Sequence, residues 1–389
     1  MASYLLACDS DSVDVRIIQL IQELDEESEV EFVPRIPRVR GYIPRNRESA
    51  AQRLWNDYFA DVPVYPAKKF KRRERYDALG RQSFTTLQKC TSVIRQLAYG
   101  LSPDALDEYL HMSEKISVLC LDNFCKCIID LYKSRYMRSP TTIDVARLYS
   151  AHEEKHGFKG MLSSIDCMQW EWKNCPVAYK GQYTRSDHKK PMIMLEAVAS
   201  YDLWIWHAFF VMTGSNNDIN VMNQSPVFDA LKKGITPSAP FEVNGHQYTK
   251  GYYLADGIYP DWATLIKGMS CPTDEPRIKF TRFQASARKD KERAFGVLQG
   301  RFHILSQPSR TLKVNQMRRV MECYLILHNM ILEDNDFALC KWEERFITEE
   351  RANRAQRVRN RGRDQDVVTR EIRDRAVHDQ LTEDLIEHI

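Results

Sequence analysis

Hydrophobic residues recur at helical spacing from residue 84 to residue 140. The first predicted helix there ends at Gly100, because glycine readily takes the left-handed conformation that closes a helix. Ser102 and Pro103 predict the start of a second, short helix, and Ser113 predicts the cap of a third. Three short helices with tight turns are typical of a helix-turn-helix module, and a plain helical bundle is the alternative.

The pattern changes after Gly160, where short apolar runs rich in β-branched and aromatic residues are separated by turns. Such runs predict strands. The predicted strands are 161–168, 192–200, 204–212 and 251–255, with a fifth at 279–283. Helical spacing then returns over 284–302 and 314–333. Strands followed by helices in this order predict an α/β domain.

The length of 389 residues allows two or three domains. The changes of pattern predict a charged arm over 1–83, a helical module over 84–150, an α/β domain over 151–340 and a charged helical tail over 341–389. The tail ends in a weak amphipathic stripe, formed by Ile372, Val377, Leu381 and Leu385.

Composition is that of an ordinary soluble globular protein, with 43% hydrophobic and 28% charged residues. The N-terminus has no basic start, so we do not expect a signal peptide. The most apolar stretch, Met192 to Met212, contains Glu196, Asp202 and His207, so we expect no membrane span and no membrane partner. Ten cysteines without a CxxC pair argue against a zinc ribbon or a secreted disulfide framework.

The net charge of +3 conceals a strong asymmetry along the chain. Residues 1–33 hold nine acidic residues and one basic residue, hence −8, whereas residues 34–81 hold thirteen basic and five acidic residues, hence +8. Such blocks often mark arms that meet a charged partner, and a solvated, self-neutralising N-terminus is the alternative. The basic cluster Lys68–Arg73 can serve as a nuclear import signal or a phosphate-binding patch.

Four acidic residues stand where predicted strands end or where the late helix turns. Asp166 lies within the first strand, Asp218 follows the third, Asp256 ends the fourth, and Glu292 lies at the border of the apolar stripe of a helix, where it can face inward. Carboxylates are the ligands that Mg²⁺ and Mn²⁺ prefer, and paired ions of this kind cleave phosphodiesters. Each acid alone is more often a turn former or solvated, so only the set is informative.

Six longer segments occur in a distinctive order: SIDCMQWEWKNCPVAYKGQY, MLEAVASYDLWIWHAFF, GSNNDINV, YYLADGIYP, RKDKERAFGVLQGRF and ILHNMILED. They closely resemble the plant PIF/Harbinger superfamily of transposases, in its Pong-like branch, and related domesticated nuclease-like proteins. The similarity runs from about Tyr42 to the C-terminus and is densest from Gly160 to Asp334.

The resemblance implies an RNase H-like fold with a DDE-type site that holds Mg²⁺ or Mn²⁺. Asp166 matches the first aspartate and Glu292 the final glutamate. Asp256 stands 36 residues before Glu292 and matches the second aspartate, and Asp218 is an additional acid of the metal site. The implied activity is that of a metal-dependent DNA endonuclease, a transposase that cleaves transposon ends and joins them to target DNA.

The resemblance also covers the helical module, which looks like the helix-turn-helix region of the family. Family members typically act in the nucleus with a separate Myb/SANT-like partner, so DNA and such a protein are the expected partners, and a homo-oligomer is left open. Lys289, Lys291 and Arg293 flank Glu292, which predicts contacts with DNA phosphate, with a solvated helix face as the alternative.

Two departures and one rival reading qualify this function. The segment before residue 84 is shorter than the family usually has, and Ala285-Ser286 stands where the family often has Glu-Ala. The rival is a domesticated transposase-derived protein that binds DNA or chromatin without cleavage. A third reading, a zinc protease, rests only on HExxH at His152–His156, which ends at a predicted helix terminus without a third ligand.

Overall fold

The structure is a computed structural model that describes residues 83–185, 189–214, 218–229, 239–340 and 365–389. The acidic and basic segments of 1–81 and the basic run 351–363 lie outside these residues. The chain divides into two compact units. The first comprises Met1–Leu131 with Arg301–Gln307, and the second comprises Tyr132–Gly300 with Pro308–Ile389.

The described part of the first unit is helical. Its elements are α4 (Thr86–Tyr99), the 3₁₀ turn η1 (Pro103–Ala105), α5 (Leu106–Leu110), the first part of α6 (Glu114–Tyr136) and η4 (His303–Ser306). Thr85 and Gln88 form a capping box that starts α4. A small apolar cluster holds the unit together, formed by Phe84, Leu106, Leu110 and Met112.

The predicted end of the first helix at Gly100 is confirmed. Gly100 has a φ of 65°, the left-handed value that glycine adopts without strain. A Cβ atom there would lie 2.9 Å from the end of the Gln307 side chain, which would have to move aside. The second helix ends at Leu110 as expected, whereas the third, α6, is a long helix of 23 residues.

The second unit is built on a mixed five-stranded sheet in the order β3-β2-β1-β6-β7. The strands are β1 (Met161–Glu171), β2 (Met192–Ala199), β3 (Ile205–Thr213), β6 (Tyr252–Leu254) and β7 (Leu265–Ile266). The first three strands pair antiparallel, whereas β6 and β7 run parallel to β1. The fold class is therefore α/β, and four of the predicted strands are confirmed.

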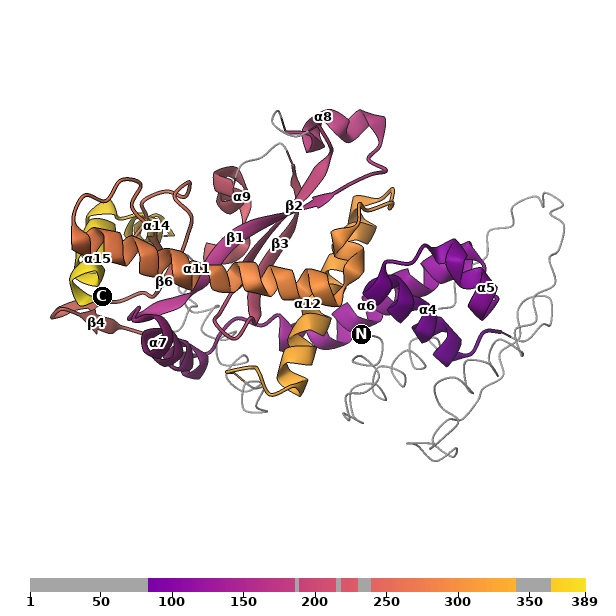
Figure 1. Cartoon of the computed structure of the whole chain (residues 1–389), viewed down its shortest axis with the longest axis horizontal. Helices are drawn as coiled ribbons and strands as arrows, with labels where there is room; N and C mark the ends of the chain where they lie inside the picture. Colours follow the sequence, from indigo (N-terminus) through magenta and orange to yellow (C-terminus); the bar gives the residue numbers. More distant parts are fainter. Residues whose placement is uncertain (1–82, 186–188, 215–217, 230–238, 341–364) are drawn as a thin grey trace. The chain divides into compact units, whose positions relative to one another are not determined.

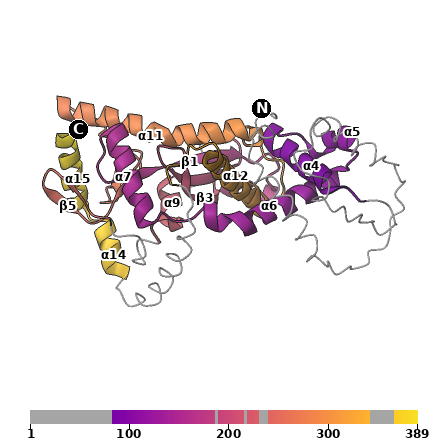
Figure 2. The ribbon, with the colours of Figure 1, turned by 90° about the horizontal axis from the view of Figure 1, so that it is seen from below.

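The second unit also contains further helices. They are α7 (Thr142–His156), α8 (Lys180–Tyr183), α9 (Asp218–Gln224), α11 (Glu275–Arg301), α12 (Val314–Asp334), α14 (Gln365–Ile372) and α15 (Arg375–His388), with 3₁₀ turns η2 (Val177–Tyr179) and η3 (Pro226–Phe228). The long helix α11 crosses the sheet along one face, which the two views at 90° both show (Figures 1 and 2). Buried Asn329 of α12 joins that helix to β3, because its side chain bonds both the N–H and the carbonyl of Ile205.

The core at one end of the unit brings together distant parts of the chain. Phe280 of α11 and Leu254 of β6 belong to the same buried cluster as Leu381 and Leu385 of α15. The hairpin of β4 (Phe241–Val243) and β5 (His246–Tyr248) packs against the same helix, at the end where α15 is drawn in Figure 1. The C-terminal helix is therefore part of this core.

The strand predicted at 279–283 is wrong, because these residues lie inside α11. Only Phe280 of this segment is buried, while Phe283 is 37% exposed, and the buried positions continue at Gln284, Ala287 and Lys291 with helical spacing. The β4–β5 hairpin was not predicted. Its signal is the Asn244-Gly245 pair, whose φ values of 49° and 83° suit a tight hairpin turn.

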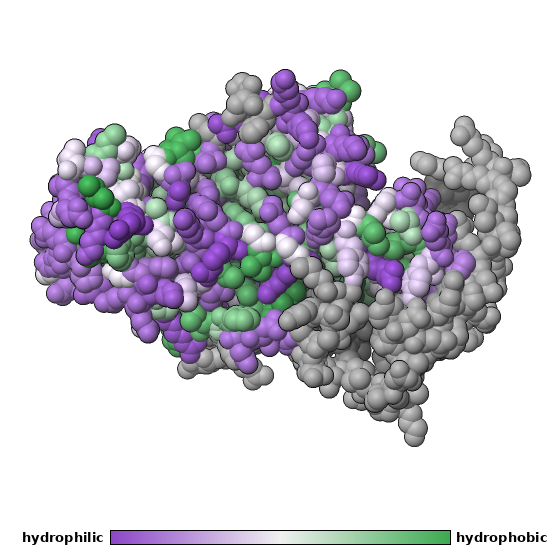
Figure 3. Space-filling view, viewed as in Figure 1, coloured by the Kyte–Doolittle hydropathy of each residue, from purple (hydrophilic) through white to green (hydrophobic). Residues whose placement is uncertain are grey.

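The surface of the second unit is mainly hydrophilic in the view of Figure 3, with apolar residues in separate patches. Among the helices that the structure describes, none combines the length and the apolar character that crossing a membrane requires.

Candidate functional site

Asp166 lies on the central strand β1, opposite Ala197 of β2. Side chains alternate between the faces of a strand, so Asp166 points away from buried Ile165 and toward the face covered by α11. The side chain keeps an exposed fraction of 22%. Its carboxylate forms an ion pair with the ammonium of Lys291, which comes from α11.

Asp256 lies near Asp166 because of the parallel pairing of β1 and β6. The register pairs Ser164 with Leu254, and the two aspartates each follow two residues later. β6 ends at Leu254, so Asp256 lies just past the strand, and both aspartates act on the pKa of Lys291 and of Asp218. Asp256 is 52% exposed, and its carboxylate lies 2.7 Å from the guanidinium of Arg288 on α11.

Lys291 is unusual because it is a buried cation. Its side chain is only 1% exposed, and lysine is almost never so buried unless it is paired. Burial lowers the pKa of Lys291, while the neighbouring Asp166 acts in the opposite direction. Arg288 and Lys291 are three residues apart on one helix face, so α11 sets one cation against each of the two aspartates.

Asp218 approaches the same region from the start of α9. Burial raises the pKa of Asp218, and the charge of Asp166 adds to this effect, followed at the end by that of Asp256. The Cys167 thiol donates a hydrogen bond to Asp218 and lies 3.7 Å from the hydroxyl of Tyr259. The three predicted aspartates therefore share one electrostatic neighbourhood.

Glu292 does not join this group in the structure. Its side chain is exposed, and no hydrogen bond or ion pair links it to another described residue. Lys289 is likewise exposed, whereas Arg293 donates to the Tyr201 carbonyl at 3.1 Å and pairs with Asp290. Of the three cations predicted to contact phosphate, Lys291 forms its ion pair with Asp166.

Two buried polar side chains of α11, Asp290 and Gln284, fix the position of this helix. Buried Asp290 lies 2.7 Å from the His156 Nε2 atom of α7. Gln284 is buried and donates to the carbonyls of Ala255 and Ile266, which lie next to Asp256 and in β7. These residues were not predicted as part of a site, because their partners are distant in sequence.

The two histidines of the HExxH segment have structural partners. His152 is fully buried, with its Nδ1 atom 3.2 Å from the Met161 carbonyl and its Nε2 atom accepting from the Tyr201 N–H at 3.2 Å. His156 is engaged with Asp290. Both ring nitrogens of His152 are therefore occupied, which leaves no lone pair for a metal ion.

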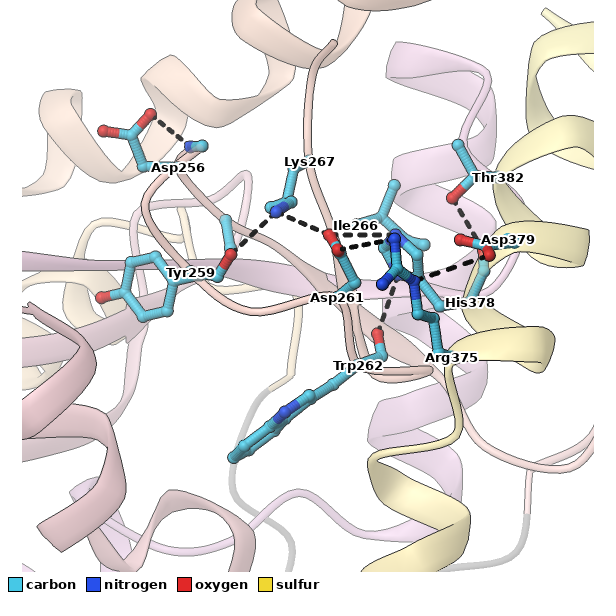
Figure 4. Close-up of polar contacts among 12 residues, drawn as sticks. Asp256, Tyr259, Asp261, Trp262, Ile266, Lys267, Arg375, His378, Asp379 and Thr382 are labelled. Carbon is cyan, nitrogen blue, oxygen red and sulfur yellow. Dashed lines mark hydrogen bonds and ion pairs between the residues drawn. The ribbon is translucent and has the colours of Figure 1, made fainter. Parts of the chain in front are cut away.

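The loop after β6 connects Asp256 to the C-terminal helix (Figure 4). Asp261 in this loop lies 2.6 Å from Lys267 and 3.7 Å from His378 of α15, and the Lys267 hydrogen bond holds the pKa of Asp261 below its usual value. His378 also bonds the Trp262 carbonyl at 3.0 Å, and Lys267 bonds the Tyr259 carbonyl at 2.9 Å. The loop is thus anchored at the end opposite to Asp256, beside a cavity of about 340 Å³.

The donor set suits a hard divalent cation in kind. Asp166, Asp218 and Asp256 offer only carboxylate oxygens. Burial raises the pKa of Asp218 most, and repulsion from Asp166 and Asp256 adds to it, so added positive charge is favoured there. Within the part of the chain that the structure describes, no three His, Cys, Asp or Glu side chains converge closely enough to hold a metal ion. The positive charge at the aspartates comes instead from Arg288 and Lys291.

Comparison with known families identifies the region that carries this site. A family model described as plant transposon protein matches residues 134–338, which is more than half of the chain and includes all four predicted acids. A second model, a domain of unknown function (DUF8418), matches residues 51–76. Comparisons with curated proteins and with solved structures gave no match.

The family match agrees with the sequence segments around the aspartates, which resemble PIF/Harbinger transposases. The chain therefore belongs to the plant transposon protein family, as a relative of the PIF/Harbinger-type transposases.

Proposed function

We propose that the second unit is the catalytic domain of a transposase-type DNA nuclease that depends on Mg²⁺ or Mn²⁺. The observation that carries the proposal is that Asp166 of β1 and Asp256, just past the end of the neighbouring strand β6, both act electrostatically on Lys291 and on Asp218. Asp218 supports it as a third acid in the same electrostatic neighbourhood. We further propose that the five-stranded sheet is the RNase H-like core that the family resemblance implies.

In this mechanism the carboxylates of Asp166 and Asp256 would hold the metal, with Asp218 assisting. Bound divalent ions supply Lewis-acid stabilisation of the phosphodiester and lower the pKa of the attacking water. Glu292 is on the same helix face as Arg288, one turn further on, so rotation of its exposed side chain would add a carboxylate to the site. Lys289 and Arg293 on the outer surface of α11 would bind the DNA backbone.

The remaining parts of the proposal concern partners. The helical first unit would contact DNA as a helix-turn-helix-like module. A Myb/SANT-like protein would assist DNA binding and nuclear entry, as the family resemblance implies. These assignments rest on the family resemblance, and with them we propose that the protein acts in the nucleus.

The nuclease is tested by incubating the full chain with supercoiled plasmid in Mn²⁺, in Mg²⁺ and in excess EDTA. We expect conversion to open-circle DNA in either metal and none in EDTA, because the carboxylates alone do not activate water.

The domesticated, non-cleaving regulator is the second candidate. It is favoured by one observation, the ion pair that already occupies Asp166 while Glu292 faces solvent. DNA retardation on a gel without nicking in either metal would support this candidate and overturn the nuclease.

A further inference from the structure

Two cations of α11 occupy the acids that the proposed function assigns to metal. The Lys291 ammonium contacts one oxygen of Asp166, Oδ2, and Arg288 lies 2.7 Å from the Asp256 carboxylate. Both cations come from one helix turn. Each aspartate therefore has a protein-borne counter-charge.

The burial of Lys291 makes its pairing with Asp166 necessary. An ammonium removed from water loses its hydration, and the loss is costly unless an opposite charge compensates it. Lys291 is 1% exposed, and Asp166 is the carboxylate that compensates it. The pair is asymmetric, since Asp166 remains 22% exposed and can be reached by a hydrated ion from its open side.

We propose that Lys291, together with Arg288, is a built-in counter-cation that competes with the divalent metal for the aspartates. This inference rests on the proposed function and deepens it. In the metal-free protein the ammonium and the guanidinium neutralise Asp166 and Asp256. When a divalent ion binds, it meets carboxylates whose charge is already partly balanced, so its affinity is lower than that of the bare acids.

The alternative for Lys291 is a contact with DNA phosphate from the helix surface. The structure favours the counter-cation, because the neighbouring lysine, Lys289, is exposed whereas Lys291 is enclosed. The anchors on either side, His156–Asp290 and Gln284 to Ala255, hold the helix face that carries Lys291 toward the sheet. A lysine held in this way neutralises the negative charge of Asp166.

The test is Mn²⁺ binding to the full chain, measured by titration calorimetry without DNA, for the unmodified protein and for Lys291→Met. We expect the variant to bind Mn²⁺ about tenfold more tightly, since an adjacent unlike charge changes the proton affinity of a carboxylate by about that factor or more. Arg288→Met is a second variant whose partly exposed side chain is safe to remove, and we expect a smaller gain in affinity.

Lys190→Met is the matched control. Lys190 lies 2.9 Å from Glu171 of the same strand β1, so the variant loses the same charge and a lysine–carboxylate pair, here at the surface and away from the aspartates. We expect its Mn²⁺ affinity to be unchanged, with circular dichroism checking that each variant is folded.

The outcomes separate this inference from the proposed function. Unchanged or weaker Mn²⁺ binding by both Lys291→Met and Arg288→Met, while the unmodified protein binds, overturns the counter-cation alone. Mn²⁺ binding by Lys291→Met but not by the unmodified protein also supports the counter-cation, because the lysine then excludes the metal completely. If no variant and no unmodified protein binds Mn²⁺, both the counter-cation and the metal-dependent function are overturned.

Discussion

Lys291 and Glu292 are neighbours in sequence with opposite environments, and this contrast defines the site at the residue scale. Lys291 is enclosed against Asp166, whereas Glu292 faces solvent. Sequence spacing correctly identified Asp166 as a strand residue directed away from Ile165. It assigned Lys291 to phosphate, because hydrophobic patterns treat lysine as a surface residue and its partner is 125 positions away.

His152 gives a pH prediction at the same scale. Burial, with a smaller effect of neighbouring His156, lowers the pKa of His152 to about 4 from its ordinary value of 6.5. Between these pH values the histidine is protonated in the unfolded chain but neutral in the folded protein. The free energy of unfolding therefore falls as the pH is lowered from about 6.5 to about 4. The loss is up to about 3 kcal/mol at 1.36 kcal/mol per pKa unit.

Urea unfolding at a series of pH values measures this effect. His152→Gln lacks the titrating ring, so we expect the unfolding free energy of this variant to depend less on pH over that interval. His303→Gln, at an exposed histidine, is the control and should keep the dependence of the unmodified protein. Equal pH dependence of all three proteins would contradict the assignment.

At the scale of elements, the apolar pattern of a segment predicted the long strands and helices, whose structure depends mainly on their own sequence. The strands β1, β2 and β3 and the helix α12 follow their apolar periodicity and were found nearly at their true limits. The two-residue strand β7 carries too little pattern to be recognised, since its position is set by pairing with β6. The error at 279–283 came from a short apolar run, which alone does not distinguish a strand from a buried helix.

The C-terminal helix α15 was indicated in the sequence only by a weak amphipathic stripe. Leu381 and Leu385 are buried in the core that also holds Phe280, although α15 lies beyond the family match at 134–338. Val377, which belonged to the predicted stripe, is instead 40% exposed. The predicted four-part division of the chain remains a prediction, but α15 itself packs with the sheet.

This packing predicts unequal costs along α15. Leu385→Ala removes a fully buried side chain, and we expect it to lower the free energy of unfolding by about 2–5 kcal/mol. Val377→Ala on the same helix should change it by less than about 0.5 kcal/mol, as for other exposed positions. Denaturant unfolding of both variants checks the difference, and similar small losses would show that α15 contributes little to the core.

At the scale of the whole molecule, a net charge of +3 conceals local specialisation. Two acids of the candidate site, Asp256 and Asp166, are paired within the second unit with Arg288 and Lys291. Composition therefore could not indicate the site. The pairing of β1 with β6, which brings Asp166 and Asp256 into one electrostatic neighbourhood, arises only in the folded sheet. The family match covers both strands and both aspartates.

The most direct test of the account is the Mn²⁺-dependent nicking rate of Asp256→Asn relative to the unmodified protein. Asp256 is 52% exposed, so its loss leaves the core intact and separates chemistry from folding. We predict a decrease of at least about 100-fold, because an amide is a poor substitute for a metal-binding carboxylate. Nicking by Asp256→Asn at the rate of the unmodified protein would contradict the central claim.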